Sequence, residues 1–148
     1  MSSTLALTGD IADAINGAKE RNRALALSYI DDEGYPSVSY RGGTFVLDDT
    51  RVAIWVRKRD GGLLKALADR PKVAMAYHNS EAEGVKLLTL KGSARVDESV
   101  ADEVYSSIHE SERAQDPDRK GIPVVIDVDS VKGFGPGGFF VQTAAGGA

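Results

Sequence analysis

The succession of short elements between Gly42 and Val96 is the feature that most constrains how this chain can fold. Its residue pattern reads strand, tight turn, strand, Gly-Gly, short helix, strand and strand. Many short strands with hairpin signals, bent at glycine pairs and accompanied by few helices, are typical of a small barrel. We therefore expect a mainly β fold, a β-barrel with accessory helices.

Alternating apolar residues predict two hairpins in the first part of the chain. The first joins a strand at 24–30 to a strand at 37–41, and the second joins 44–47 to 51–57. Gly42-Gly43 is expected to bend or break the sheet between the two hairpins.

Three helices are expected, at 10–18, 63–70 and 97–111. The third is the longest of them, because apolar residues recur one helical turn apart from Val100 to Ile108. Pro71 disfavours a helical conformation at the residue before it and so ends the second helix.

The remaining segments differ in polarity. The run Val85 to Leu90 is largely apolar and predicts a strand buried on both faces, which Gly92 would allow to bend. The polar segment 112–121 is expected to be flexible. The glycine-rich segment 134–140 is expected to form a mobile or ligand-lining loop.

A basic cluster ends the strand 51–57 and precedes a glycine pair. Arg57, Lys58 and Arg59 are followed by Gly61 and Gly62, which open the helix at 63–70. Backbone N–H groups at a helix start and nearby cations together favour an anion, and phosphate is the ligand we expect. The alternative is a solvated turn after a strand. For Trp55 we favour a core aromatic on the barrel wall over a stacking surface for a ring system.

Composition excludes several classes of protein. The 148 residues carry a net charge of −4, which argues against general nucleic-acid binding. There are no cysteines, so disulfides and thiol catalysis are excluded. His78 and His109 lack metal-ligand spacing, and no Gly-x-Ser-x-Gly motif predicts a hydrolase. No stretch is apolar enough for a membrane span or secretion signal, so a cytoplasmic location is expected.

Three stretches of sequence together resemble a known family. They run from Gly42 to Trp55, from Leu63 to Tyr77, with Arg70-Pro71 at the helix end, and from Leu90 to Val96. This order resembles the flavin-binding split-barrel family, typified by pyridoxine 5′-phosphate oxidase and including deazaflavin-dependent reductases. With the preceding hairpin, the resemblance covers about half of the chain.

The resemblance implies an FMN-binding split barrel that spans residues 1–148 as a single domain. It also implies a homodimer with the cofactor in grooves at the interface, transferring hydride or electrons to an unidentified small organic acceptor. We assign no catalytic residue and no metal ligand. The expected cofactor-binding residues are Arg41, Trp55, Val56, Arg57, Lys58, Arg59, Gly61, Gly62, Leu63 and Lys65.

The chain departs from the family pattern at two points. Gly61, Gly62 and Leu63 stand where relatives often have Ser-Arg-Lys, and Lys86-Leu87-Leu88 stands where a glutamine is usual. Neither leucine can hydrogen-bond a flavin ring, so pyridoxine-phosphate oxidase activity itself is not expected.

Three functional readings therefore stay open. We favour an FMN-dependent oxidoreductase. The first alternative is a deazaflavin (coenzyme F-420) reductase, whose ligand has a long anionic tail that Arg41, Lys86 and Lys91 would bind. The second alternative is a non-catalytic flavin or small-ligand binding protein.

Overall fold

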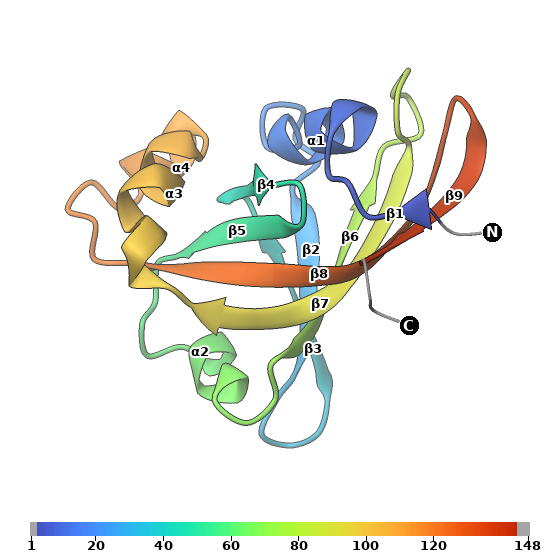
Figure 1. Ribbon diagram of the computed structural model, residues 1–148. Helices are drawn as coiled ribbons and strands as arrows, with labels where there is room; N and C mark the ends of the chain where they lie inside the picture. The colour runs from blue at the N-terminus through green and yellow to red at the C-terminus, as the bar shows by residue number, and fades with distance from the viewer. Residues whose placement is uncertain (1–2, 145–148) are drawn as a thin grey trace.

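The computed structural model describes residues 3–144, which form a strongly curved sheet with short helices around it (Figure 1). The strands are β1 (Ser3–Thr4), β2 (Leu25–Ile30), β3 (Pro36–Arg41), β4 (Thr44–Asp48), β5 (Arg51–Val56), β6 (Lys72–His78), β7 (Leu87–Val96), β8 (Ile122–Gly135) and β9 (Gly138–Thr143). The helices are α1 (Gly9–Asn16), α2 (Gly62–Leu67), α3 (Ala101–Ser107) and α4 (Glu110–Ala114), with a 3-10 turn η1 (Glu98–Val100) before α3. No helix in the described part is long and apolar enough to cross a membrane.

The long strand β8 runs through the middle of the sheet (Figure 1). One edge of β8 pairs with β7, and the other pairs first with β5 and then with β9. The β7–β8 register shifts between Lys91 and Gly92, as a bulge does. A Cβ on Gly92 would lie 2.3 Å from the carbonyl oxygen of Asp127, so the predicted bend at this position requires glycine.

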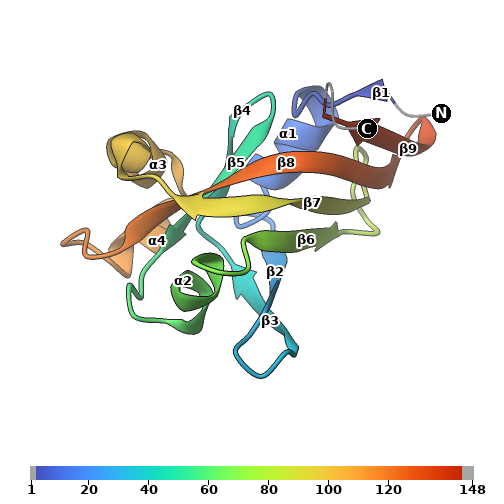
Figure 2. The same cartoon turned by 60° about the horizontal axis from the view of Figure 1, so that its bottom comes forward.

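The sheet curls like a barrel but does not close. Its strand order is β1-β9-β8-β7-β6-β2-β3, and β4 attaches through β5 to β8. Within residues 3–144 no ladder joins β3 to β4, although the two strands are consecutive and separated only by Gly42-Gly43. Figure 2 shows the β2–β3 hairpin projecting away from β4 and β5. The expected mainly β, split-barrel fold is confirmed.

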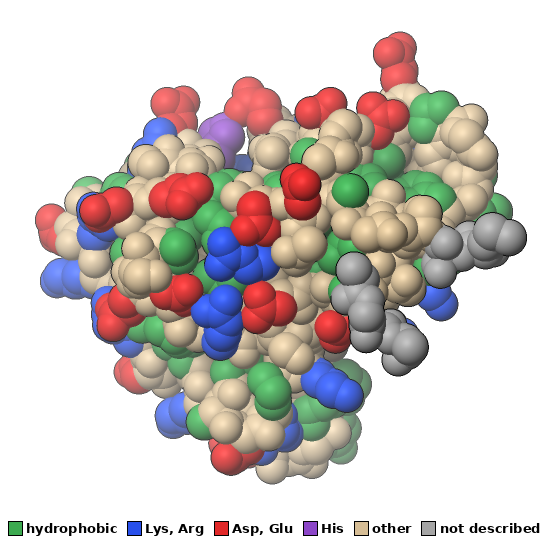
Figure 3. All heavy atoms as spheres, in the orientation of Figure 1, with side chains coloured by type: hydrophobic (Ala, Val, Ile, Leu, Met, Phe, Trp, Pro, Cys, Tyr) green, Lys and Arg blue, Asp and Glu red, His purple; other side chains and the backbone are tan. Residues whose placement is uncertain are grey.

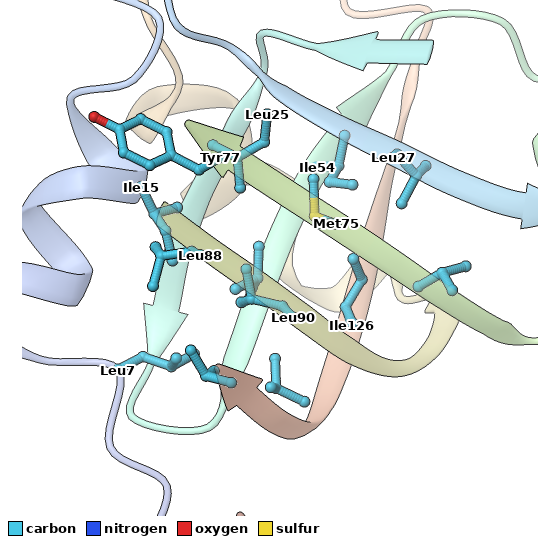
Figure 4. Close-up of a cluster of buried hydrophobic side chains, with 14 of the residues drawn as sticks. Leu7, Ile15, Leu25, Leu27, Ile54, Met75, Tyr77, Leu88, Leu90 and Ile126 are labelled. Carbon is cyan, nitrogen blue, oxygen red and sulfur yellow. The ribbon is translucent and has the colours of Figure 1, made fainter. Parts of the chain in front are cut away.

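The main core fills the inside of the curl and is covered at one end by α1 (Figure 4). Val52, Ile54 and Val56 of β5 point into it. The intervening residues Ala53 and Trp55 point to the opposite face, where they join a second, smaller cluster. The remaining buried members of this cluster are Phe45, Val104 and Ile108, so β4 and α3 enclose it.

The expectation of a single long helix at 97–111 is wrong. The segment forms η1, α3 and α4 as separate short pieces, and the chain is extended at Ile108, with φ −74° and ψ 162°. Leaving the helix there lets Ile108 enter the second cluster, where it is 3% exposed. His109 then caps α4, because its ring accepts a hydrogen bond from the backbone N–H of Ser111.

Two further expectations are corrected by the strand geometry. The run Val85 to Leu90 is not a strand buried on both faces, because β7 begins at Leu87 and alternates, with Leu88 and Leu90 inward and Leu87 40% exposed. The segment 134–140 is not a mobile loop, because it is mainly the paired ends of β8 and β9, which turn at Gly135–Gly138.

The segment 112–121, expected to be flexible, is held in place by Asp116. Its buried carboxylate accepts hydrogen bonds from Trp55 Nε1 at 2.8 Å and from the backbone N–H groups of Lys120 and Gly121. Burial alone would raise the pKa of Asp116. The three hydrogen bonds and the nearby charge of Arg57 outweigh burial and hold the pKa below its usual value.

We predict that Asp116→Ala destabilises the protein by about 2 to 3 kcal/mol, because the buried indole N–H loses its acceptor. Asp118→Ala, in the same segment but exposed, is the matched control and should have little effect. Denaturant unfolding checks both variants. Because the native pKa is depressed, the difference from the parent should be full above about pH 5 and shrink as the pH falls below about 4. A difference that does not change with pH would contradict the role given to the charge.

Candidate functional site

A cleft of about 380 Å³ lies where the barrel is split, between β3 and the end of β5, with α2 and α4 beside it. Eight of the ten residues expected to bind the cofactor line it: Arg41, Trp55, Val56, Arg57, Lys58, Gly61, Gly62 and Leu63. The other lining residues are Tyr29, Ser39, Tyr40, Gly42, Gly43 and Glu112. The fold therefore brings the end of β3 to the basic end of β5.

Arg41 supplies a cation that is half-buried in this cleft. Its Nε atom is buried and has no hydrogen-bond partner among the described residues, and no described carboxylate forms an ion pair with it. Burial lowers the pKa of the Arg41 guanidinium, Tyr29 partly offsets this effect, and the charge of Arg57 lowers the pKa further. The group still carries its charge at neutral pH, so the cleft holds an uncompensated cation.

The hydroxyl of Ser39 is a second buried polar group without a partner in the described structure. Ser39 and Arg41 lie two apart on β3, so their side chains are on the same face of the strand. A buried donor without an acceptor is costly unless a ligand satisfies it. The two orphaned groups together mark the place where an anion would be stabilised.

Arg57 and Lys58 extend this positive region at the mouth of the cleft. Both are exposed, and Arg57 Nη1 donates a 2.6 Å hydrogen bond to Gln115 Oε1. That neutral partner orients the guanidinium without cancelling its charge.

The glycine pair acts through its lack of side chains more than through the helix it opens. A Cβ on Gly62 would lie 2.7 Å from the Tyr29 hydroxyl, so a side chain there would push the Tyr29 ring end out of its place. The helix α2 has only six residues, and its dipole contributes less to anion binding than the sequence pattern suggested.

Two of the expected binding residues lie outside the cleft lining. Arg59 turns to the other side of its loop, where it donates to the carbonyl oxygens of Lys120 and Gly121 and pairs with Glu98. Lys65 is exposed on α2. The structure therefore does not bring these two cations together with Arg41 and Arg57.

Trp55 contributes to the wall of the cleft and offers no open ring face. Its indole is 7% exposed, packs edge-on against Tyr105 with 5.1 Å between ring centroids, and is bonded to Asp116. Trp55 is thus a core aromatic, as the sequence favoured.

Glu112, Tyr29 and Ser39 are cleft residues that sequence analysis missed. The side chain of Glu112 is 12% exposed and lies so close over Gly42 that a Cβ on Gly42 would clash with the carboxylate. The Oε1 atom of Glu112 is 3.5 Å from Lys19 Nζ. Glu112 lies far along the chain from Gly42. The only local signal for this contact is the glycine pair, which leaves room for a side chain from elsewhere.

Lys86 and Lys91 do not join Arg41 in one groove. Lys91 lies with Lys72 in a hollow on the outer face of the sheet. The ammonium of Lys86 donates to the carbonyl oxygens of Ser80 and Ala82. Within the described residues there is also no cluster of His, Asp and Glu side chains that could hold a metal ion.

No family model and no curated protein matches the sequence, but solved structures share its fold. HupZ from Group A Streptococcus is 19% identical with a TM-score of 0.62, covering 89% of this chain and 97% of its own. A protein related to general stress protein 26, of the pyridoxinephosphate oxidase family, from Clostridium acetobutylicum is 10% identical with a TM-score of 0.63, covering 90% and 94%. A heme binding protein from Mycobacterium smegmatis is 18% identical with a TM-score of 0.59, covering 89% and 57%.

These likenesses show the fold, which is that of the pyridoxine-phosphate oxidase-like split barrels, as the sequence resemblance implied. At such low identity they do not say what the cleft binds.

We predict that Glu112→Gln raises the affinity for an anionic ligand such as FMN about three- to tenfold, because it removes a negative charge from the cleft that holds Arg41 and Arg57. Glu110→Gln, on the same helix but exposed and outside the cleft lining, is the matched control. Fluorescence titration with FMN measures both. Weaker binding by Glu112→Gln would show instead that the ligand needs this carboxylate as an acceptor.

Proposed function

We propose that this chain binds a phosphorylated flavin-type cofactor, with FMN the first choice, and acts as an oxidoreductase on a small organic molecule. The observation that carries the proposal is the half-buried Arg41, whose Nε has no partner in the described structure, beside Arg57 and Lys58. A cation buried without a counter-ion is costly, and a phosphate in the cleft would compensate it.

The residues present fit the phosphate end of such a cofactor. Arg41 can donate two parallel hydrogen bonds to phosphate oxygens, Arg57 and Lys58 add charge, and Ser39 adds a hydroxyl donor. When bound, a flavin supplies the hydride and electron chemistry, and the protein binds it, orients it and excludes water.

A second copy of the chain would complete the site. The volume of about 380 Å³ is near the lower end of small-molecule pockets, so one cleft encloses part of a cofactor rather than all of it. Beside the cleft, the β2–β3 hairpin exposes a patch of large apolar residues: Ile30 (40%), Tyr35 (66%), Val38 (64%) and Tyr40 (78%). Patches of this kind mark protein interaction sites, and we propose a homodimer through it.

FMN is favoured over the deazaflavin coenzyme because the cations are concentrated in one cleft. A long anionic tail needs charges along an extended path, and Lys86 and Lys91 lie in separate hollows from Arg41. The alternative of a flavin-binding protein without turnover is supported by two departures from the family pattern. Gly61 and Gly62 stand where relatives often have polar and basic residues, and Leu87 and Leu88 stand where a glutamine is usual.

A porphyrin is a second candidate ligand, favoured by one observation. A hollow of about 310 Å³ is lined by His78, Leu87 and the aromatic pair Phe134 and Phe139, with Phe139 83% exposed. Such a surface offers apolar walls and an imidazole, the usual ligand of heme iron. Absorption spectra after incubation with FMN or hemin separate the two: a Soret shift lost in His78→Ala would support the porphyrin.

We predict that Arg41→Ala weakens FMN binding by about ten- to a hundredfold, since a charge-assisted contact to phosphate is lost from a partly desolvated cleft. Lys65→Ala, which removes an exposed cation outside the cleft lining, should change the affinity by less than about twofold. Calorimetric titration of FMN into both variants and the parent provides the measurement. Equal losses in the two variants would place the phosphate outside this cleft.

The dimer is tested separately. Light scattering at micromolar concentration should give twice 15.7 kDa for the parent. Val38→Arg should give a monomer, because the substitution buries two unpaired charges in the interface. Phe139→Arg, at an exposed residue on β9, should stay dimeric. A monomeric parent would contradict the proposal.

A further inference from the structure

Residues 109–115, which we call the strap, lie beside the cleft without a buried side chain. They comprise α4 and one residue on each side of it, and buried residues flank them: Ile108 is 3% exposed and Asp116 is 8% exposed. The backbone–backbone hydrogen bonds of the strap join its residues to one another or to Asp116. A helix as short as α4 is not stable on its own in water. The strap therefore keeps its shape only through side-chain contacts with the rest of the protein.

These contacts are polar and lie at or near the surface. The pairs are His109 with Glu20, Glu112 with Lys19, Gln115 with Arg57, and Arg113 with Ser106 and Tyr105. Exposed ion pairs of this kind add little stability, and salt screens them. Local opening of a native protein occurs in segments with few buried contacts. The strap is such a segment.

The strap also places a negative charge in the cleft. Glu112 lines the cleft, whose other charged residues are the cations Arg41, Arg57 and Lys58. We propose that the strap is an autoinhibitory gate, which holds Glu112 in the cleft as an internal anion when closed and opens when an anionic ligand binds. This regulation rests on the anion binding proposed for the cleft, whereas the opening of the strap itself does not.

The direction of the coupling follows from two contacts. A ligand shifts an equilibrium between two states only by the difference in its affinity for them. In the closed state Glu112 repels an anion, and Gln115 accepts a hydrogen bond from Arg57 Nη1 that a phosphate oxygen would otherwise accept. Both contacts favour the open state once an anion is bound. Because coupling is reciprocal, the closed strap weakens anion binding by the factor by which the anion favours opening.

Lys19 stabilises the closed strap from the segment between α1 and β2. Its Nζ atom is 3.5 Å from Glu112 Oε1. Gly42 leaves room for this pair, because a Cβ there would clash with the Glu112 carboxylate and lie 3.1 Å from Lys19 Cδ. Arg23 lies on the same segment, is exposed and forms no ion pair within residues 3–144. Arg23 is therefore the matched control for the loss of the Lys19 charge.

Opening of the strap is measured by amide hydrogen exchange of the full chain, followed by NMR without ligand. The backbone N–H groups of Glu112 and Arg113 both donate to the His109 carbonyl oxygen, so they exchange when the strap opens. Lys19→Met should speed exchange at these two amides about two- to fivefold, because one surface ion pair is lost. Arg23→Met should leave the rates at the parent's values. Unchanged rates in Lys19→Met would overturn the gate.

The effect of a ligand is measured on the same two amides with saturating FMN. Binding of a ligand ordinarily slows exchange near its site, whereas the gate requires the opposite. FMN should speed exchange about three- to tenfold in the parent, the factor expected for the affinity gain of Glu112→Gln. The FMN effect should vanish in Glu112→Gln and persist in Glu110→Gln. Slower or unchanged exchange with FMN bound to the parent would overturn the proposal, as would equal responses of the two variants.

Inorganic pyrophosphate separates this proposal from the proposed function, because it is an anion that needs no flavin site. Pyrophosphate should also speed exchange of the strap amides in the parent, and not in Glu112→Gln. If FMN fails to bind while pyrophosphate has this effect, the gate stands and the proposed function falls. If FMN binds while neither anion speeds exchange, the gate alone is overturned.

Discussion

The pairing of β8 with three strands is the constraint on which the rest of the structure depends. Residues 122–126 are buried, with the main core on one face, and they hold β5 on one edge and β7 on the other. Every backbone polar group buried there needs a partner, so both edges must be occupied. Further along, β9 replaces β5, and the two halves of the sheet diverge. The curl leaves β3 and β4 as open edges, and the cleft lies between β3 and the end of β5.

Local patterns in the sequence predicted the elements well where a strand has one buried face. The alternation in β5 and the turns at 31–34 and 48–50 are sufficient to give both hairpins. The sequence predicted that Val85–Leu90 is a strand buried on both faces, but residues 122–126 are the ones that fit this description. The prediction failed because a run of apolar residues does not show which faces of a strand are covered. The prediction of one helix at 97–111 failed because of tertiary packing. Burial of Ile108 in the second cluster outweighed helical propensity.

The candidate site was predictable to the extent that it is local. The basic run ending β5 and the glycine pair identify one wall, but which cations point into the cleft depends on distant contacts. Arg59 donates hydrogen bonds to the carbonyl oxygens of Lys120 and Gly121 and so lies outside the cleft, whereas Glu112 reaches the cleft from α4. Acidic side chains gather along the edge of the molecule where α1 and α4 lie (Figure 3). The net charge of the chain therefore hides a local positive site.

The contact between Trp55 and Asp116 has a consequence for how the molecule can be observed. Trp55 is the one tryptophan in the sequence, so all indole emission comes from the second cluster. The ring touches Tyr105 of α3, its N–H is bound to the 112–121 segment, and its strand forms the wall of the cleft. Its fluorescence will thus respond to loosening of α3 and α4 while the main core stays intact. The chain carries a built-in optical reporter for opening of the helical cover, separate from global unfolding.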